Sequence, residues 1–166
     1  DPPSLSLSVT LDGLGLFWFH FPSSRWNPGI PGIPAWPSGL EEPREILPES
    51  QMCQKILGMI ETELRGKLPE ARAIPVVSVF PALPPILGQP NSLVCVVENI
   101  FPPVLDISWT SGGAVVTSGV TQGPFVPSAD LTFVRLSRLA VVPRAGDVHA
   151  CVVTEPGTNR STVVYW

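Results

Sequence analysis

Residues 94–109 read VCVVENIFPPVLDISW, an apolar stretch with Cys95 near its start and Trp109 at its end. Trp109 lies fourteen residues after Cys95, and Cys151 lies fifty-six residues after Cys95. Two cysteines at this spacing typically join the two sheets of a β-sandwich, with a tryptophan packed against the bridge. The spacing therefore predicts a Cys95–Cys151 disulfide, which in turn indicates an oxidising compartment.

The sequence on both sides of this stretch is typical of short strands separated by turns. About seven strands are expected, at residues 76–80, 92–98, 105–109, 114–117, 131–142, 148–154 and 162–166. Together with the cysteines, they predict an all-β immunoglobulin constant-type sandwich for residues 74–166. His149 stands where this fold usually carries a tyrosine, two residues before the second cysteine. We interpret it as a structural histidine, and a pH-sensing role is the alternative.

Residues 1–73 have a different pattern and predict an α+β domain of antiparallel strands plus one helix. Leu5 to Leu11 alternate with polar residues, Asp12-Gly13 reads as a turn, and residues 14–21 are an aromatic run, so a hairpin is expected. Seven prolines between residues 22 and 48 favour a short strand and irregular chain. A helix is expected between Pro48 and Gly66, with an apolar stripe that would either pack on a sheet or line a ligand groove; the stripe is Met52, Ile56, Met59, Ile60 and Leu64.

Composition limits the partners that this chain can bind. Hydrophobic residues make up 44% of the chain, which is enough for a packed core, and charged residues make up only 14%, which is too few for a disordered chain. The net charge of -4 argues against binding to nucleic acid or to an anionic membrane surface. No run of roughly 18 to 20 apolar residues occurs, as a membrane span would require. Because the last residue is the strand-like Trp166, we expect an excised ectodomain with a membrane anchor beyond it.

The side chains needed for catalysis do not gather in this sequence. The two histidines, His20 and His149, fall in different halves, and Cys53 has no evident base beside it. We expect no bond chemistry, no metal and no cofactor. Asn159-Arg160-Ser161 is a candidate N-glycan site, with an ordinary polar turn as the alternative.

The segment 94–109 resembles the membrane-proximal immunoglobulin domain of class II MHC alpha chains, and residues 87–91 strengthen the match. Strands followed by one helix also fit the first domain of these chains, which supplies half of a two-chain groove. Within the family, the resemblance is to the DM alpha chains, peptide-exchange catalysts of antigen presentation, through residues 16–21, 66–69, Arg72 and 163–166.

Two further features favour the DM type over a peptide-presenting alpha chain. Residues 46–73 contain no asparagine, whereas presenting chains hold the peptide backbone with asparagines on this helix. Cys53 resembles the DM alpha cysteine that pairs with a cysteine on the first strand of the groove, so its partner is expected on a strand preceding this sequence. A buried free cysteine is the alternative.

The resemblance implies an alpha subunit that pairs with a DM-like beta chain, binds peptide-loaded class II molecules and catalyses peptide exchange by stabilising a peptide-receptive conformer. It implies Arg72 and Asn99 as contacts to the class II molecule, a DO-like inhibitor among the partners, and the late endosomal or lysosomal membrane, with the domains in the lumen. An ordinary peptide-presenting alpha chain is the alternative, followed by an unrelated adhesion or receptor fragment.

Overall fold

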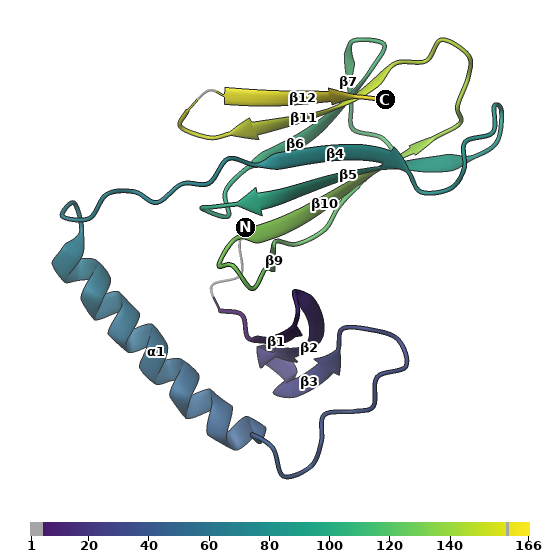
Figure 1. Ribbon diagram of the computed structural model, residues 1–166. Coiled ribbons are helices and arrows are strands. Elements are labelled where there is room, and N and C mark those ends of the chain that lie inside the picture. The colour runs from purple at the N-terminus through teal and green to yellow at the C-terminus, as the bar shows by residue number, and fades with distance from the viewer. Residues whose placement is uncertain (1–4, 159) are drawn as a thin grey trace. The chain divides into compact units, whose positions relative to one another are not determined.

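The computed structural model describes residues 5–158 and 160–166. These residues form one α-helix, one short 3-10 helix and twelve strands in three sheets. The chain divides into two compact units, with the division between Ala71 and Arg72 (Figure 1). The first unit contains strands and the helix, and the second is all-β, so the expected fold class is confirmed.

A three-stranded antiparallel sheet begins the first unit, with strands β1 (Ser8–Leu11), β2 (Leu14–His20) and β3 (Arg25–Pro28). Leu11 pairs with Leu14 across a two-residue turn. Asp12 and Gly13 both have positive φ, 49° and 80°, as a tight hairpin turn of this type requires. The predicted hairpin and the predicted short third strand are thus confirmed.

The small core of this sheet is aromatic. Phe19 is 3% exposed and meets the rings of Phe21 and Trp26 edge to face, and Trp26 stacks on Trp36 with 4.2 Å between ring centroids. The apolar residues whose alternation predicts a buried face are not fully buried. Leu5, Leu7 and Val9 are half-buried, and Leu11 is 61% exposed.

The helix α1 (Pro43–Leu64) begins five residues before the predicted start at Pro48. The backbone N–H of Glu42 donates to the Glu45 carboxylate, and Pro43 occupies the first turn, where a missing N–H costs nothing. Pro48 lies inside the helix and has no backbone N–H, so one hydrogen bond of the helix is missing there. At the other end Gly66 has a φ of 75°, so its predicted role after the last turn is confirmed.

The apolar stripe of α1 is exposed in this chain. Met52 is 58%, Ile56 44% and Met59 63% exposed, while Ile46 near the N-terminal end is only 3% exposed. The stripe is therefore not ordinary core of the isolated chain.

The second unit consists of two antiparallel sheets (Figure 1). One contains β4 (Val76–Pro81), β5 (Asn91–Ile100), β8 (Val120–Gln122), β9 (Val126–Pro127) and β10 (Phe133–Val141). The other contains β6 (Asp106–Ser111), β7 (Ala114–Val116), β11 (His149–Glu155) and β12 (Arg160–Tyr165). All seven predicted strands are present, and β8 and β9 are additional short strands that were not predicted.

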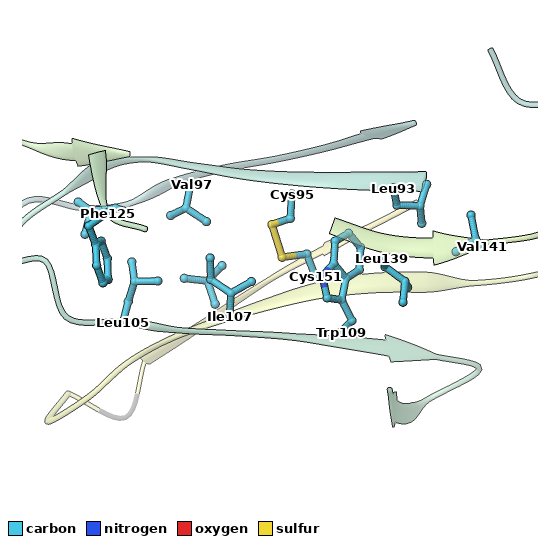
Figure 2. Close-up of a cluster of buried hydrophobic side chains, with 12 residues drawn as sticks. Leu93, Cys95, Val97, Leu105, Ile107, Trp109, Phe125, Leu139, Val141 and Cys151 are labelled. Atoms are coloured by element: carbon cyan, nitrogen blue, oxygen red, sulfur yellow. A yellow bond between two sulfur atoms is a disulfide. The ribbon is translucent and has the colours of Figure 1, made fainter. Parts of the chain in front are cut away.

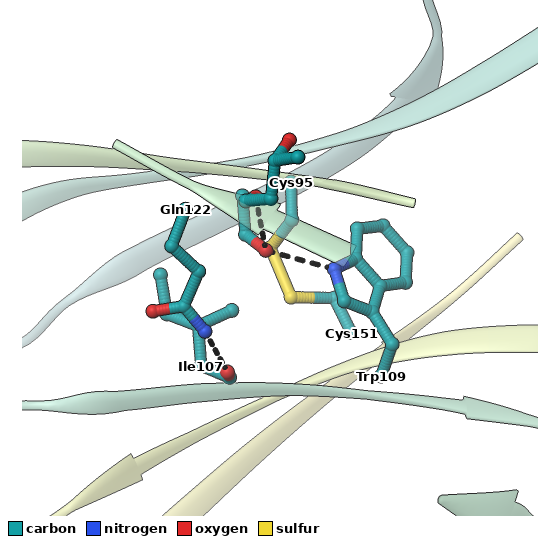
Figure 3. The surroundings of a disulfide bond; sticks show 7 residues. Cys95, Ile107, Trp109, Gln122 and Cys151 are labelled. Carbon is teal, nitrogen blue, oxygen red and sulfur yellow. Dashed lines mark hydrogen bonds between the residues drawn. A yellow bond between two sulfur atoms is a disulfide. The ribbon is translucent and has the colours of Figure 1, made fainter. Parts of the chain in front are cut away.

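A continuous apolar cluster fills the space between these two sheets (Figure 2). Cys95 on β5 and Cys151 on β11 form a disulfide with 6.3 Å between their Cα atoms. Trp109 is fully buried beside the bridge, and its Nε1 donates to the Ser137 hydroxyl at 2.9 Å (Figure 3). That hydroxyl donates in turn to the Thr121 carbonyl at 3.3 Å, so both the indole N–H of Trp109 and the hydroxyl of Ser137 are satisfied.

Candidate partner-contact site

The segment that enters the sandwich is held against the end of strand β5. The backbone N–H of Ala73 donates to the Phe101 carbonyl at 3.0 Å, and Asn99 Nδ2 donates to the Ile74 carbonyl at 2.9 Å. These two bonds fix residues 73–74 beside residues 99–101. The predicted contact residues Arg72 and Asn99 therefore belong to the same end of the second unit.

Asn99 is suited to its position for a reason of backbone geometry. Its φ is 55°, in the left-handed region that asparagine tolerates better than most residues other than glycine. Its half-buried carboxamide uses one N–H for the Ile74 carbonyl. Among the contacts of the described residues, the carboxamide oxygen and the second N–H are not engaged, so the same side chain can hold the linker and still hydrogen-bond to a partner.

A small hollow of about 40 Å³ lies next to this junction. It is lined by Arg72, Pro75, Ile100, Phe101, Pro102, Val104, Glu155 and Pro156. This volume is far below the roughly 300 to 1,000 Å³ typical of a site for a small-molecule ligand. The hollow is therefore too small to hold a typical metabolite.

The walls of the hollow combine both charges with apolar surface. Arg72 contributes a guanidinium, Glu155 contributes a carboxylate, and Val104 is 52% exposed. Sequence reasoning named Arg72 and Asn99 but missed Phe101 and Glu155. Their position could have been inferred, because the loops after the second and sixth strands of an immunoglobulin sandwich lie at the end where the chain enters.

Cys53 lies on α1 and carries an exposed free thiol. The alternative of a buried free cysteine is therefore wrong for this chain. The pairing of Cys53 with a cysteine on a preceding strand stays a prediction, since it concerns residues outside this sequence.

The two histidines occupy structural positions. His20 Nδ1 lies 2.6 Å from the Ser23 hydroxyl and accepts from the Ser23 N–H in the short 3-10 helix (Phe21–Ser23). His149 is 6% exposed and stacks on Trp166, with Nε2 4.0 Å from Asp147 Oδ2. A tyrosine at this position usually donates a hydrogen bond from its hydroxyl to the backbone. Within the described residues neither ring nitrogen of His149 makes a hydrogen bond, so the imidazole does not take over this role.

Three other sequence-based expectations can be set beside the structure. Asn159 lies outside the described residues, and its glycosylation stays a prediction. No group of three or more His, Cys, Asp or Glu side chains that could hold a metal ion occurs in residues 5–158 and 160–166. The helices of that same part of the chain include none with the length and apolar character to cross a bilayer.

Comparison with known proteins agrees with this architecture. Residues 77–158 match the immunoglobulin C1-set domain family. The human class II histocompatibility antigen DM alpha chain is 33% identical over 166 residues, which covers 99% of this chain and 62% of the relative. The mouse class II M alpha chain is 30% identical over 164 residues, with the same two shares. The human DQ alpha 2 chain is 41% identical over 93 residues, or 56% of this chain and 36% of the relative.

Together, the fold and these matches identify a protein in which an α+β unit precedes an immunoglobulin C1-set domain. The chain belongs to the class II MHC alpha-chain family. It spans about 62% of the length of the DM and M alpha chains that it matches.

Proposed function

We propose that this chain is the alpha subunit of a DM-like heterodimer that binds class II MHC molecules and catalyses peptide exchange. The observation that carries the proposal is the extent of similarity. The DM and M alpha chains align with both halves of the chain, over 99% of its length, whereas the DQ alpha 2 chain aligns with 93 residues. The absence of asparagine from residues 46–73 supports the same choice over a peptide-presenting chain.

The proposed mechanism is a shift of population between two states of the class II molecule. A partner that binds a peptide-receptive conformer more tightly than the closed one raises the population of that conformer without breaking a covalent bond. In this proposal Arg72 and Asn99 contact the class II molecule, and the hollow beside them receives one of its side chains. The geometry supports this because both residues lie at one end of a rigid, disulfide-linked unit.

Pairing with a beta chain is also part of the proposal. The first unit leaves Ile60 45% and Leu64 37% exposed on the helix, which is surface that a second chain and the closed groove can cover. A DO-like inhibitor is a further proposed partner. We place the domains in the lumen of late endosomes or lysosomes, with a membrane anchor after Trp166.

The test is co-expression with a DM-type beta chain, followed by release of a fluorescent peptide from a class II molecule at pH 5 and pH 7. We expect faster release at substoichiometric amounts of the heterodimer, with the larger effect at pH 5. Stoichiometric, slowly dissociating peptide bound by the heterodimer itself would instead identify a peptide-presenting chain.

Two substitutions test the contact site. Arg72→Ala removes the guanidinium, and Asn99→Gly removes the carboxamide while still permitting a positive φ. Both are expected to slow catalysed release about tenfold, which corresponds to losing one or two hydrogen bonds to charged or polar groups. Arg138→Ala, at an exposed position on β10, is the matched control. If all three variants release peptide equally fast and remain heterodimeric, Arg72 and Asn99 are not contacts.

A further inference from the structure

The end of the sandwich opposite the partner-contact site is formed by three segments, at residues 82–90, 111–116 and 142–148. Backbone hydrogen bonds tie them together: Gly88 N–H donates to the Pro143 carbonyl at 2.8 Å, and Gly112 N–H donates to the Val148 carbonyl at 2.9 Å. In Figure 1 the loops between β4 and β5 and between β10 and β11 lie at the end of the sandwich where β12 finishes. We call these three segments the distal end.

Apolar side chains project from each segment of the distal end. In residues 82–90, Leu83 is 63%, Ile86 54% and Leu87 67% exposed. The other two segments add Val115 at 70%, Val142 at 46% and Val148 at 51% exposed. Six large apolar side chains are thus exposed on three segments that hydrogen bonds join, a grouping that favours an interaction surface.

The distal end is almost uncharged and poor in backbone donors. Residues 82–90 and 111–116 contain no charged side chain, and residues 142–148 contain only Arg144 and Asp147. Pro84, Pro85 and Pro90 have no N–H, so fewer polar groups of this loop need water. The other end of the sandwich carries charged residues at or near its loops, among them Asp130 and Glu155.

The loop is also held in one conformation. Asn91 Oδ1 accepts from the Leu83 N–H at 3.2 Å, and Asn91 Nδ2 donates to the Leu83 carbonyl at 2.8 Å. The apolar tip is therefore presented by a fixed loop, which lowers the conformational entropy lost when it contacts another surface.

We propose that the distal end is a lipid-contact surface that rests in the headgroup region of a bilayer. This rests on the proposed function, in which a membrane anchor follows Trp166 and keeps this end of the sandwich at the membrane. The apolar loops, in which Arg144 and Asp147 are the charged residues, suit the interface between headgroups and acyl chains. Because the chain has a net charge of -4, the contact is with zwitterionic lipid, and anionic lipid weakens it.

The test uses the 166-residue chain with a C-terminal hexahistidine tag, attached to phosphatidylcholine vesicles that contain a nickel-chelating lipid. The reference is the same chain attached to a soluble nickel-chelating dextran. Hydrogen exchange measured by mass spectrometry reports residues 82–90. We expect exchange in this loop to slow by about fivefold or more on vesicles relative to dextran, and to recover part of its rate with phosphatidylserine present.

Ile86→Asp with Leu87→Asp is expected to abolish the vesicle-dependent protection. Leu131→Asp is the matched control, because Leu131 is 82% exposed in a loop at the opposite end. Equal exchange on vesicles and dextran overturns the proposal. So does protection on both supports that rises with chain density, which would instead assign the distal end to contacts between copies. Neither class II molecules nor a beta chain are present, so this result is independent of peptide exchange.

Discussion

In the unit that ends at Ala71, Phe19 and Ile46 are the buried apolar side chains among the described residues, whereas the unit that starts at Arg72 buries a continuous cluster around Trp109. The second unit closes its core with a disulfide and satisfies its buried indole N–H. The first unit leaves the apolar stripe of its helix in water. The comparison teaches that the sandwich carries its own stability, whereas the first unit leaves apolar surface uncovered, as the proposed pairing with a second chain requires.

The largest expected effect concerns the disulfide. Cys95→Ala with Cys151→Ala should lower the free energy of unfolding of the second unit by roughly 4 kcal/mol, because the bridge closes a long loop and so restricts the unfolded chain. Denaturant titration followed by tryptophan fluorescence measures this loss. The far-ultraviolet helical signal of the first unit should be unchanged at low denaturant. A parallel loss of helix would show that the two units fold as one.

The next prediction compares two isoleucines in the two units. Ile107→Ala should destabilise the second unit by about 3 kcal/mol, because Ile107 is 4% exposed and a cavity would remain. Ile56→Ala should cost less than about 0.5 kcal/mol in the isolated chain, because Ile56 is 44% exposed. Paired denaturation curves give both values. A large cost at Ile56 in the isolated chain would contradict the contrast between the units.

A smaller effect is expected from the buried hydroxyl beside the disulfide. Ser137→Ala should destabilise the second unit by about 2 kcal/mol, because the indole N–H of the fully buried Trp109 loses its acceptor. Ser92→Ala serves as the control, since its hydroxyl makes only a 3.5 Å contact with the Leu139 carbonyl in a half-buried position. Equal midpoints for the two variants would mean that water replaces the hydroxyl of Ser137.

Two substitutions at Asn99 separate the contribution of its backbone conformation to stability from that of its side chain. Asn99→Ala should be less stable than Asn99→Gly by about 1 kcal/mol, because alanine is strained at a φ of 55° and glycine is not. Both variants lose the bond to Ile74. Thermal unfolding of the two proteins in parallel supplies the difference, and the reverse order of stability would rule out the conformational explanation.

The smallest effect is a pH dependence at Asp130. The Thr132 hydroxyl and backbone N–H donate to the carboxylate and lower the pKa of Asp130 below 3.8. The stabilisation is therefore present above the unfolded-state pKa and is lost as the pH falls through the folded-state pKa. At about pH 5, above the ordinary pKa of an aspartate, the contact stays intact. An NMR titration should show the midpoint rising in Thr132→Val, and an unchanged midpoint would reject the hydroxyl as its cause.

The sequence predicted the features that depend on local pattern or on covalent spacing. Cys95, Trp109 and Cys151 specified the sandwich, and Asp12-Gly13 specified the hairpin turn. The helix begins earlier than predicted because it tolerates Pro48 in its interior, and because Glu42, Pro43 and Glu45 form a favourable N-terminus upstream. Strands β8 and β9 were missed because runs of two or three residues show no periodicity.

The candidate site was less accessible to sequence reasoning. Arg72 and Asn99 came from family resemblance, but the positive φ of Asn99 and its bond to the Ile74 carbonyl depend on how the linker packs against β5. Glu155 and Phe101 line the hollow together with Arg72. No local pattern marks them, and only the known loop arrangement of an immunoglobulin sandwich could have indicated their position. A structural role was predicted for His149. That its ring is buried without hydrogen bonds could not be predicted, because the sequence does not show which groups surround a single histidine in a strand.

The position of the disulfide also has a mechanical consequence. The disulfide joins Cys95 to Cys151 across a sequence separation of 56 residues and so closes a covalent loop. Residues 72–94 precede this loop, and residues 152–166 follow it. A force applied between Arg72 and Trp166 can therefore peel β4 from β5 and β12 from β11, but it cannot lengthen the chain between the two cysteines. The domain behaves as a spacer of limited extensibility, so a pull on one end is transmitted to the other instead of being absorbed by unfolding of the whole sandwich.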